Sequence, residues 1–181
     1  MSLKKEQVLI IGASGHAKVV IDIFEKSQQV EIIGLIDAEP QPTPDVLGYP
    51  VLGKEWELQH ILQKYHYAQV FIAVGNNYNR KLVYQKIKNI APHTIFATAV
   101  HPSAQIGKSV QIGKGVAIMA GSIINSDTFI GDFSIINTKV SIDHDCVIGQ
   151  FSSIAPGATV GGTVVIGEMS AIGIGATIKH S

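Results

Sequence analysis

Residues 100–178 read VHPSAQ-IGKSVQ-IGKGVA-IMAGSI-INSDTF-IGDFSI-INTKVS-IDHDCV-IGQFSS-IAPGAT-VGGTVV-IGEMSA-IGIGAT-I when the chain is divided into groups of six. Every group opens with Val or Ile, and its fifth place holds a small or compact residue. The 3.6-residue period of a helix does not keep this spacing on one face, and a plain alternating strand does not need it. Repeats of this length are typical of short strands stacked into a parallel β-helix, whose coils bury apolar residues against one another. We therefore expect a β-helix with the aliphatic residues pointing inward.

The first half of the chain has a different pattern, in which short apolar runs alternate with helical stripes. We expect buried strands at residues 8–11, 31–36 and 70–74, and helices at residues 17–27, 54–65 and 78–90. The apolar residues expected to contribute to helix packing are Val19, Val20, Ile23, Phe24, Trp56, Leu58, Ile61, Leu62, Leu82, Val83 and Ile87. Pro40, Pro42 and Pro44 indicate a loop.

A strand, a glycine turn, a helix and a second strand form a βαβ unit, which predicts a parallel sheet. We therefore predict two domains, a Rossmann-like α/β domain at residues 1–97 and a β-helix at residues 98–181. The chain stops within the hexapeptide that Ile178 opens and would leave a strand edge unprotected, so we expect a truncated chain or a separate cap over the last coil.

The composition excludes several classes of function. The chain has 14 basic and 14 acidic residues, which argues against a surface for nucleic acid or an anionic membrane. Its apolar runs have the length of strands, far short of a membrane span, and no signal segment opens it. The single Cys146 excludes an internal disulfide framework. A cytoplasmic protein is the simplest interpretation.

The three expected strands of the first domain end in residues that often contact ligands. Gly12-Ala-Ser-Gly15-His16 follows the first strand, Asp37 the second, and Gly75-Asn-Asn the third. Ligands of open α/β sheets bind at this edge, and a glycine turn before a helix lets backbone N–H groups approach a phosphate. Gly12-x-x-Gly15 is not the dinucleotide fingerprint, so a tight turn without a ligand stays an alternative.

His144 is the one histidine inside a well-developed coil, at the third place of its hexapeptide, so its side chain should face outward. Asp143 and Asp145 flank it, and a carboxylate bonded to one ring nitrogen fixes the tautomer and raises the basicity of the other. An ordinary solvated histidine is the alternative. The residues expected above and below it, Ser126 and Gly162, are small, as a substrate groove requires.

Five motifs together resemble one acyltransferase group: Gly-Ala-Ser-Gly-His, Leu-Ile-Asp, Ala-Val-Gly-Asn-Asn with a following Arg, His-Pro, and the hexapeptides. The chain resembles the sialic acid O-acetyltransferases and nucleotide-sugar N-acetyltransferases of bacteria, including the UDP-4-amino-sugar enzymes, over residues 8–178. The resemblance implies a left-handed β-helix with three hexapeptides per coil, a homotrimer, and acetyl transfer from acetyl-CoA to a sugar or sugar nucleotide in surface-glycan synthesis. It implies no metal.

The resemblance also implies roles for individual residues, each carried over by its position in a motif. The sugar nucleotide would contact Ser14, Gly15, His16, Asp37 and Gly75. His144 would be the catalytic base, with Asp145 strengthening it and Asn137 bordering the site. Ser153, Gly162 and Ile174 would line the coenzyme A cleft between subunits. Ala38 stands where the UDP-sugar enzymes often carry a second acid.

The expected mechanism is direct acyl transfer, because Cys146 is expected inside the coil and no other residue offers an acyl-enzyme. A zinc site like that of hexapeptide carbonic anhydrases needs three converging histidines, which the spacing of His101 and His144 does not provide. A nucleotide-dependent reductase is disfavoured by the missing fingerprint. A non-catalytic partner of polysaccharide enzymes remains the alternative; replacing His144 distinguishes it from an enzyme.

Overall fold

The computed structural model describes residues 5–38 and 44–180. The chain divides into two compact units, Met1–Ala97 and Thr98–Ser181. Of the three prolines expected in a loop, Pro40 and Pro42 lie outside the described residues, whereas Pro44 precedes a short strand. Within the described part of the chain, no helix combines the length and apolar character needed to cross a bilayer.

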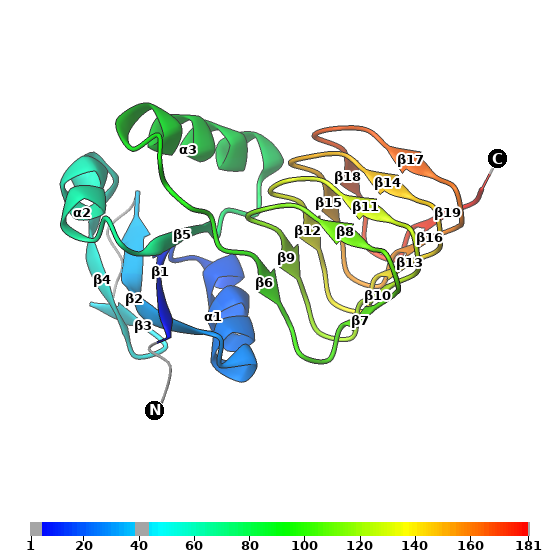
Figure 1. The fold of residues 1–181 in the computed structure, drawn as a ribbon, viewed down its shortest axis with the longest axis horizontal. Helices are drawn as coiled ribbons and strands as arrows, with labels where there is room; N and C mark the ends of the chain where they lie inside the picture. Colours follow the sequence, from blue (N-terminus) through cyan, green and yellow to red (C-terminus); the bar gives the residue numbers. More distant parts are fainter. Residues whose placement is uncertain (1–4, 39–43, 181) are drawn as a thin grey trace. The chain divides into compact units, whose positions relative to one another are not determined.

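The N-terminal unit contains a five-stranded sheet with the order β3-β4-β2-β1-β5 (Figure 1). All its neighbours pair in parallel except β3, which is antiparallel to β4. This confirms the expected α/β class with a parallel sheet. In chain order the elements are β1 (Glu6–Ile11), α1 (Gly15–Ser27), β2 (Val30–Asp37), β3 (Asp45–Val46), β4 (Tyr49–Lys54), the 3-10 helix η1 (Glu55–Glu57), α2 (Leu58–Lys64), β5 (Gln69–Ile72) and α3 (Asn77–Ile90).

Several details of this unit differ from expectation. The hairpin of β3 and β4 was not anticipated, and the helix expected at residues 54–65 is a strand end, a 3-10 turn and the shorter α2. Trp56 is 70% exposed, because it lies in the 3-10 turn with the Lys54 ammonium 4.7 Å from its ring centroid. Val19 and Leu82 are also exposed, since α1 and α3 bury the neighbouring faces that contain Val20 and Ile87.

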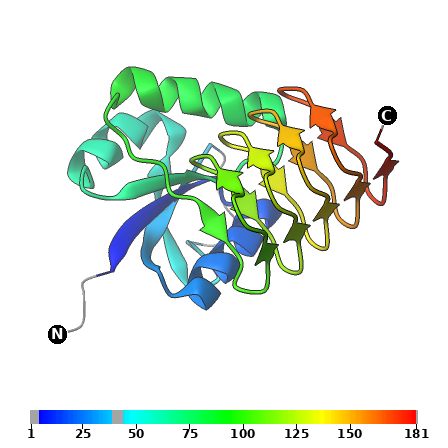
Figure 2. The same cartoon turned by 45° about the vertical axis from the view of Figure 1, so that its right-hand side comes forward.

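The C-terminal unit consists of two-residue strands that form three parallel sheets, with the orders β19-β16-β13-β10-β7, β17-β14-β11-β8 and β18-β15-β12-β9-β6. Figure 2 shows these strands stacked as successive coils. The strands are β6 (Ala99–Val100), β7 (Gln105–Ile106), β8 (Gln111–Ile112), β9 (Ala117–Ile118), β10 (Ile123–Ile124), β11 (Phe129–Ile130), β12 (Ile135–Ile136), β13 (Ser141–Ile142), β14 (Val147–Ile148), β15 (Ser153–Ile154), β16 (Thr159–Val160), β17 (Val165–Ile166), β18 (Ala171–Ile172) and β19 (Thr177–Ile178).

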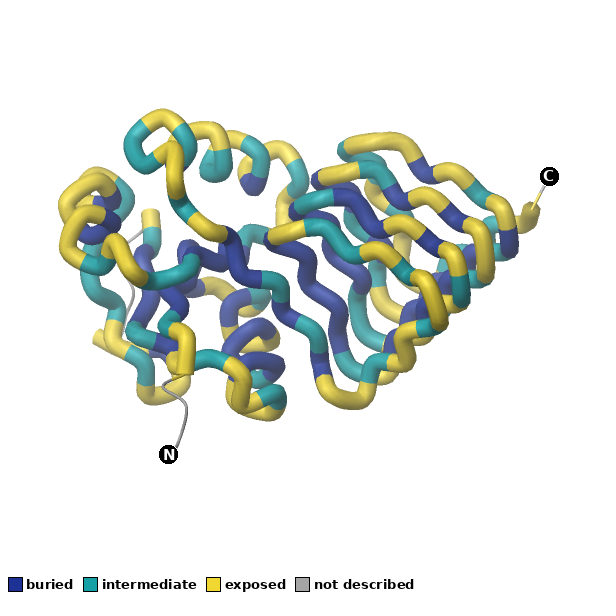
Figure 3. Tube along the Cα trace, viewed as in Figure 1, coloured by how far each residue is buried: buried dark blue, intermediate teal, exposed yellow. Residues whose placement is uncertain are grey.

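Each coil repeats after three hexapeptides, as the register of the strands shows. Ile124 pairs with Ile142, and Ile142 pairs with Val160 on the next coil. The aliphatic residues that open the hexapeptides of the middle coils, such as Ile130 and Ile148, point inward and are fully buried, whereas Ile106 in the first coil is 39% exposed. Figure 3 shows the resulting succession of buried and exposed segments along the coils. The β-helix expected from the repeats is confirmed.

Polar residues at the fifth place of the hexapeptides are buried without loss of hydrogen bonding. The Ser122 hydroxyl donates to the Asn137 carbonyl at 2.9 Å, and the Thr128 hydroxyl donates to the Asp143 carbonyl at 3.0 Å. A buried hydroxyl costs free energy only when it has no hydrogen-bond partner. These side chains therefore fill the core without that cost, and their hydrogen bonds link one corner of the coil to the next.

Candidate active site

His144 lies at the corner that follows β13, and its side chain is 57% exposed. The next residue, Asp145, has a left-handed backbone conformation with φ of 56°. This turn brings the Asp145 Oδ2 atom within 2.7 Å of His144 Nδ1. A carboxylate can only accept a hydrogen bond, so Nδ1 carries the proton and Nε2 keeps the lone pair. The imidazole is therefore arranged as a base that presents Nε2.

A second carboxylate strengthens this base. The hydrogen bond that Asp145 accepts from Nδ1 raises the pKa of His144 above its usual value, and the charge of Asp143 raises it further. Asp143 is itself held in place, because its Oδ1 accepts from Asn125 Nδ2 at 2.9 Å and from the His144 backbone N–H at 2.9 Å. The bond from Asn125 is the main cause of the lowered pKa of Asp143, so this carboxylate stays ionised beside the imidazole.

The imidazole lies against the next coil at Gly162, which is buried. A Cβ atom built on Gly162 would be 2.9 Å from His144 Cε1 and 3.0 Å from Nε2. The distance to Cε1 is shorter than real Cβ contacts, and the distance to Nε2 is tighter than nearly all of them, so a side chain at this position would have to displace the ring. Of the residues expected to line the coenzyme cleft, Gly162 is thus the one that contacts the base.

Cys146 follows this turn and points into the coil, where it is fully buried. Its Sγ lies 3.2 Å from the Gly161 carbonyl, and burial raises the pKa of the thiol. A thiol that is protonated and inaccessible is a poor nucleophile. The arrangement favours direct transfer over an acyl-enzyme at Cys146.

Asn137, Ser153 and Ile174 lie on another part of the same unit. Ser153 is in β15, and Asn137 and Ile174 follow β12 and β18 of the same sheet. His144 and Gly162 instead follow β13 and β16, which belong to the next sheet. One chain therefore presents these expected site residues in two separate groups, with β13 between Asn137 and His144.

In the N-terminal unit, the glycine turn leads into a helix whose first N–H groups are not capped by Ser14. This residue is the N-cap of α1, but its side chain makes no capping hydrogen bond. The N-cap of α3, by contrast, uses Asn76 Oδ1 to accept from the Asn79 N–H at 3.0 Å. A Cβ on Gly15 would meet no atom within 4 Å. The start of α1 therefore has room and donors for an anion.

Gly12 has a structural reason to be glycine. Its φ is +109°, and a Cβ there would be 2.7 Å from the Ala73 carbonyl oxygen. The first glycine of the turn thus lets β1 continue close to the end of β5, whereas the second, Gly15, faces open space.

His16 and Arg80 form the electrostatic surroundings of this turn. Arg80 is 1% exposed, and its Nη1 donates to the carbonyls of Val74 and Gly75 at 2.8 and 3.0 Å. Burial lowers the pKa of Arg80 to about 10, so the guanidinium stays charged at neutral pH. Burial and the charge of Arg80 together lower the pKa of His16 to about 4, which makes this imidazole neutral. Among the residues that the structure describes, none forms a hydrogen bond with its buried Nε2 atom.

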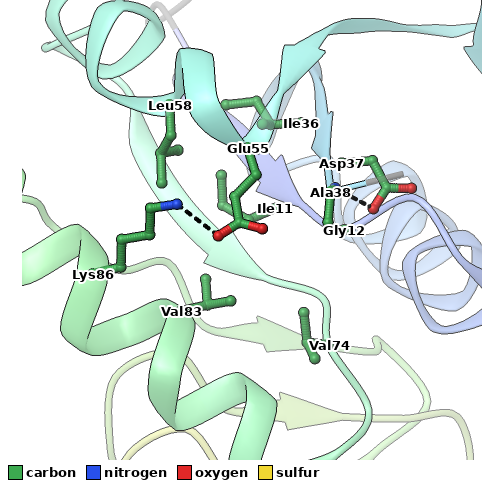
Figure 4. A pocket seen from close by; sticks show the side chains of 10 residues that line it. All are labelled: Ile11, Gly12, Ile36, Asp37, Ala38, Glu55, Leu58, Val74, Val83 and Lys86. Carbon is green, nitrogen blue, oxygen red and sulfur yellow. Dashed lines mark hydrogen bonds and ion pairs between the residues drawn. The ribbon is translucent and has the colours of Figure 1, made fainter. Parts of the chain in front are cut away.

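A pocket opens at the carboxyl ends of β1, β2 and β5, with a cavity of about 60 Å³ (Figure 4). It brings Gly12 and Asp37 together at one edge of the sheet, as expected. The Asp37 carboxylate accepts from the Ala38 N–H at 2.8 Å. The remaining lining residues are Ile11, Ile36, Ala38, Glu55, Leu58, Val74, Val83 and Lys86.

Some residues of both sites were not identified from the sequence. Asn125 supports Asp143 from one coil away, a contact that the 18-residue register reveals once the column of each residue is known. Glu55 and Lys86 were overlooked because they are 31 residues apart and carry no motif; only the fold joins them. Among the described residues, no group of three or more His, Cys, Asp or Glu side chains gathers as a metal site.

Comparisons with known proteins agree with this architecture. The family model described as PglD N-terminal domain matches residues 7–87. The acetyltransferase domain of PglB from Neisseria gonorrhoeae FA1090 is 30% identical, with a TM-score of 0.85 over 96% of this chain and 82% of that chain. PerB from Caulobacter crescentus, solved with CoA and GDP-perosamine, is 35% identical, with a TM-score of 0.77 over 100% of this chain and 94% of that chain.

A variant of the perosamine N-acetyltransferase from Caulobacter crescentus, also solved with CoA and GDP-perosamine, is 33% identical, with a TM-score of 0.72 over 100% of this chain and 94% of that chain. The expected left-handed form of the β-helix and the resemblance are thereby confirmed. The chain belongs to the nucleotide-sugar acetyltransferases of the hexapeptide-repeat family.

Proposed function

We propose that this protein transfers the acetyl group of acetyl-CoA to the amino group of a nucleotide-linked amino sugar, with His144 as the general base. The observation that carries the proposal is the imidazole itself, held through Nδ1 by Asp145 at 2.7 Å so that Nε2 is available to a substrate. The amine as acceptor is supported by the perosamine N-acetyltransferase to which the chain is similar.

In the proposed step, the amine nitrogen attacks the thioester carbonyl carbon of acetyl-CoA, and the carbon–sulfur bond breaks. His144 Nε2 takes the proton from the nitrogen and returns it to the departing thiolate, so that the base is regenerated. A positioned base of this kind contributes typically 10²–10⁴-fold to the rate. Asp143 and Asp145 stabilise the imidazolium that forms between the two proton transfers.

The sugar nucleotide is proposed to bind to the N-terminal unit. The uncapped start of α1 and the open space at Gly15 suit a diphosphate, whose charge the buried Arg80 attracts. Neutral His16 can donate to or accept from the same ligand without adding charge. Asp37 at the end of β2 suits the hydroxyls of a ribose. At Gly75, which follows β5, a Cβ would meet no atom within 4 Å, so this position also leaves room for a ligand.

We also propose that the active form is a homotrimer. Since the two groups that contain His144 and Ser153 follow different sheets of one β-helix, a coenzyme that contacts both needs two copies of the chain. The outward residues of β11, β14 and β17 are Phe129, Val147 and Val165, all at least 41% exposed. This apolar column is a surface that association would cover.

The proposal includes a cytoplasmic location and a role in bacterial surface-glycan synthesis, as the family resemblance implies. It is tested by incubating the protein with acetyl-CoA and either UDP- or GDP-linked amino sugars, while the release of free thiol is measured. The wild type should acetylate at least one of them. His144→Ala should reduce turnover by roughly 10²–10⁴-fold.

Two controls keep this test specific. Lys108→Ala removes an exposed residue two coils away in the same column as His144 and should leave turnover unchanged. Binding of the sugar nucleotide to His144→Ala should match the wild type, because the N-terminal unit is intact. Full turnover in His144→Ala would refute the role of the imidazole.

A further inference from the structure

Glu55 and Lys86 form an ion pair in the lining of the pocket at the carboxyl edge of the sheet. Lys86 Nζ donates to Glu55 Oε1 at 2.6 Å, from α3 to the first residue of η1. In Figure 4 the Glu55 carboxylate is drawn between the Lys86 ammonium and Asp37, with the apolar side chains of Leu58 and Ile36 on one side and those of Val83 and Val74 on the other. A flat apolar ring inserted here would meet Ile11, Leu58 and Val83 and would have its polar edge beside the pair.

The pair offers an unusual combination of hydrogen-bonding groups. A carboxylate presents two acceptor oxygens in one plane, and an ammonium presents three donors and no acceptor. Both side chains are 43% exposed, and ion pairs of this kind are weak. A ligand can therefore share the pair or replace it at little cost.

Guanine is the base whose edge matches this combination best. Its N1–H and 2-amino group are adjacent donors, which the two oxygens of one carboxylate accept together, and its O6 accepts from an ammonium beside them. Uracil has a single N–H between two carbonyls, so the second carboxylate oxygen would face a carbonyl. Adenine and cytosine each offer one amino donor next to a ring nitrogen, which again leaves one carboxylate oxygen without a donor.

We propose that Glu55 and Lys86 read the base of the bound nucleotide and select guanine. Glu55 accepts from N1–H and the 2-amino group, and Lys86 donates to O6. This inference rests on the proposed function, since it assigns the base of the nucleotide that the N-terminal unit would hold. Ala38, which lines the same pocket, agrees with it, because no second acid follows Asp37 to compete for the base.

The test measures the affinity of the full-length protein for GDP, IDP, UDP, CDP and ADP by isothermal titration calorimetry. IDP is the decisive probe, since its base keeps N1–H and O6 but lacks the 2-amino group. Hydrogen bonds to a charged group change affinity by roughly tenfold to hundredfold. GDP should therefore bind roughly tenfold or more tightly than IDP, and more tightly than the other three nucleotides.

Two substitutions then assign the contacts to the pair. Glu55→Gln keeps the shape but replaces one acceptor by a donor, so GDP and IDP should bind with nearly equal, reduced affinity. Lys86→Met should weaken GDP and IDP by the same factor and leave their ratio as in the wild type. Asp22→Asn is the matched control, because it removes one charge from the exposed Asp22–Lys26 pair of α1 outside the pocket; it should leave all five affinities unchanged.

The outcomes separate this inference from the function on which it rests. Equal affinity of the wild type for GDP and IDP, or tighter binding of UDP than of GDP, overturns the selection of guanine and leaves nucleotide binding standing. A ratio of GDP to IDP affinity that survives Glu55→Gln overturns the role of Glu55. Absence of binding of all five nucleotides overturns this inference and the proposed nucleotide site together.

Discussion

The His144 imidazole and the Gly162 backbone are packed so closely that a single methyl group at Gly162 would lie 2.9 Å from Cε1 and 3.0 Å from Nε2 of the ring. The two residues stand one coil apart in the same column, where the β13–β16 pairing fixes their separation. The backbone of one coil therefore forms the wall against which the base on the previous coil is oriented.

Gly162→Ala should impair turnover without unfolding the protein. The methyl group must push the imidazole away, and a displacement of about 1 Å at a reacting group can cost roughly 10²-fold in rate. We expect kcat to fall by about that factor while the affinity for the sugar nucleotide is unchanged. Gly167→Ala is the control, since a Cβ there meets only Ser170 Oγ at 3.8 Å; loss of activity in both variants alike would argue against a specific role of Gly162.

The pH dependence of turnover should reveal the carboxylate beside the base. His144 acts as a base when neutral, so the rate rises as pH increases through its pKa, which Asp145 holds above the usual value. Asp145→Asn removes that contribution, and the acidic limb of the pH–rate profile should move to lower pH with a lower maximal rate. Asn tolerates the left-handed conformation of this residue.

The matched control for this shift is Asp127→Asn. Asp127 occupies the same place one coil earlier, with φ of 60°, whereas His144 Nδ1 donates its hydrogen bond to Asp145. Its profile should coincide with that of the wild type. An acidic limb that does not move in Asp145→Asn would contradict the assignment of His144 as the titrating base.

The two glycines of the first turn should respond oppositely to alanine. Gly15→Ala places a methyl group in open space, so the melting temperature should be retained while the KM for the sugar nucleotide rises. Gly12→Ala combines φ of +109° with a contact of 2.7 Å to the Ala73 carbonyl, so the fold should lose stability, by roughly 1–3 kcal/mol. Thermal unfolding gives the melting temperature of both variants, and substrate titration gives their KM for the sugar nucleotide. An unchanged KM in Gly15→Ala would argue against a ligand at this turn.

The repeats explain why so much of the C-terminal unit could be predicted. An aliphatic residue at every sixth position specifies a coil that packs only against the coils next to it. The pattern therefore predicts which side chains point inward and which residues of adjacent coils stack on one another. The outward position of His144 and its flanking acids followed from that pattern. The contact between His144 and Asp145 was expected from the family resemblance and not from the repeats, because it depends on the left-handed turn at Asp145, which the hexapeptide spacing does not encode.

The N-terminal unit was less predictable because its contacts join residues that are distant in sequence. Trp56 was assigned to a buried helical face, although the chain at this point makes a 3-10 turn between β4 and α2. The pairing of Glu55 with Lys86 depends on where α3 crosses the pocket. The hydrophobic periodicity of a helix or strand predicts which of its faces is buried, but it does not predict which residues its polar side chains contact.

His16 should make the stability of the protein depend on pH. Its folded pKa of about 4 lies below the ordinary histidine pKa of 6.5, so the unfolded chain binds the proton more readily. The contribution of neutral His16 to the free energy of unfolding is therefore fully present above pH 6.5. It is lost as the pH falls toward 4, and the loss is at most about 3 kcal/mol. His16→Gln should flatten this dependence in melting curves, whereas His60→Gln, an exposed residue of α2, should not. A histidine signal of the wild type that titrates near pH 4 by NMR would confirm the cause; one that titrates near 6.5 would contradict it.

A mixture of two inactive variants should regain activity if each active site uses two copies of the chain. His144→Ala removes the base at one corner, and Ser153→Phe obstructs the sheet that contains β15; each variant alone should be nearly inactive. In mixed assemblies, an intact His144 corner of one copy meets an intact Ser153 surface of another, so part of the activity returns.

The two chains are coexpressed with different tags, isolated through both tags, and assayed for thiol release. Coexpression of His144→Ala with Gly162→Ala is the matched control, because both changes affect the same corner and no pairing restores it. No regain in the first mixture, with trimers confirmed by light scattering, would place the complete site on a single chain.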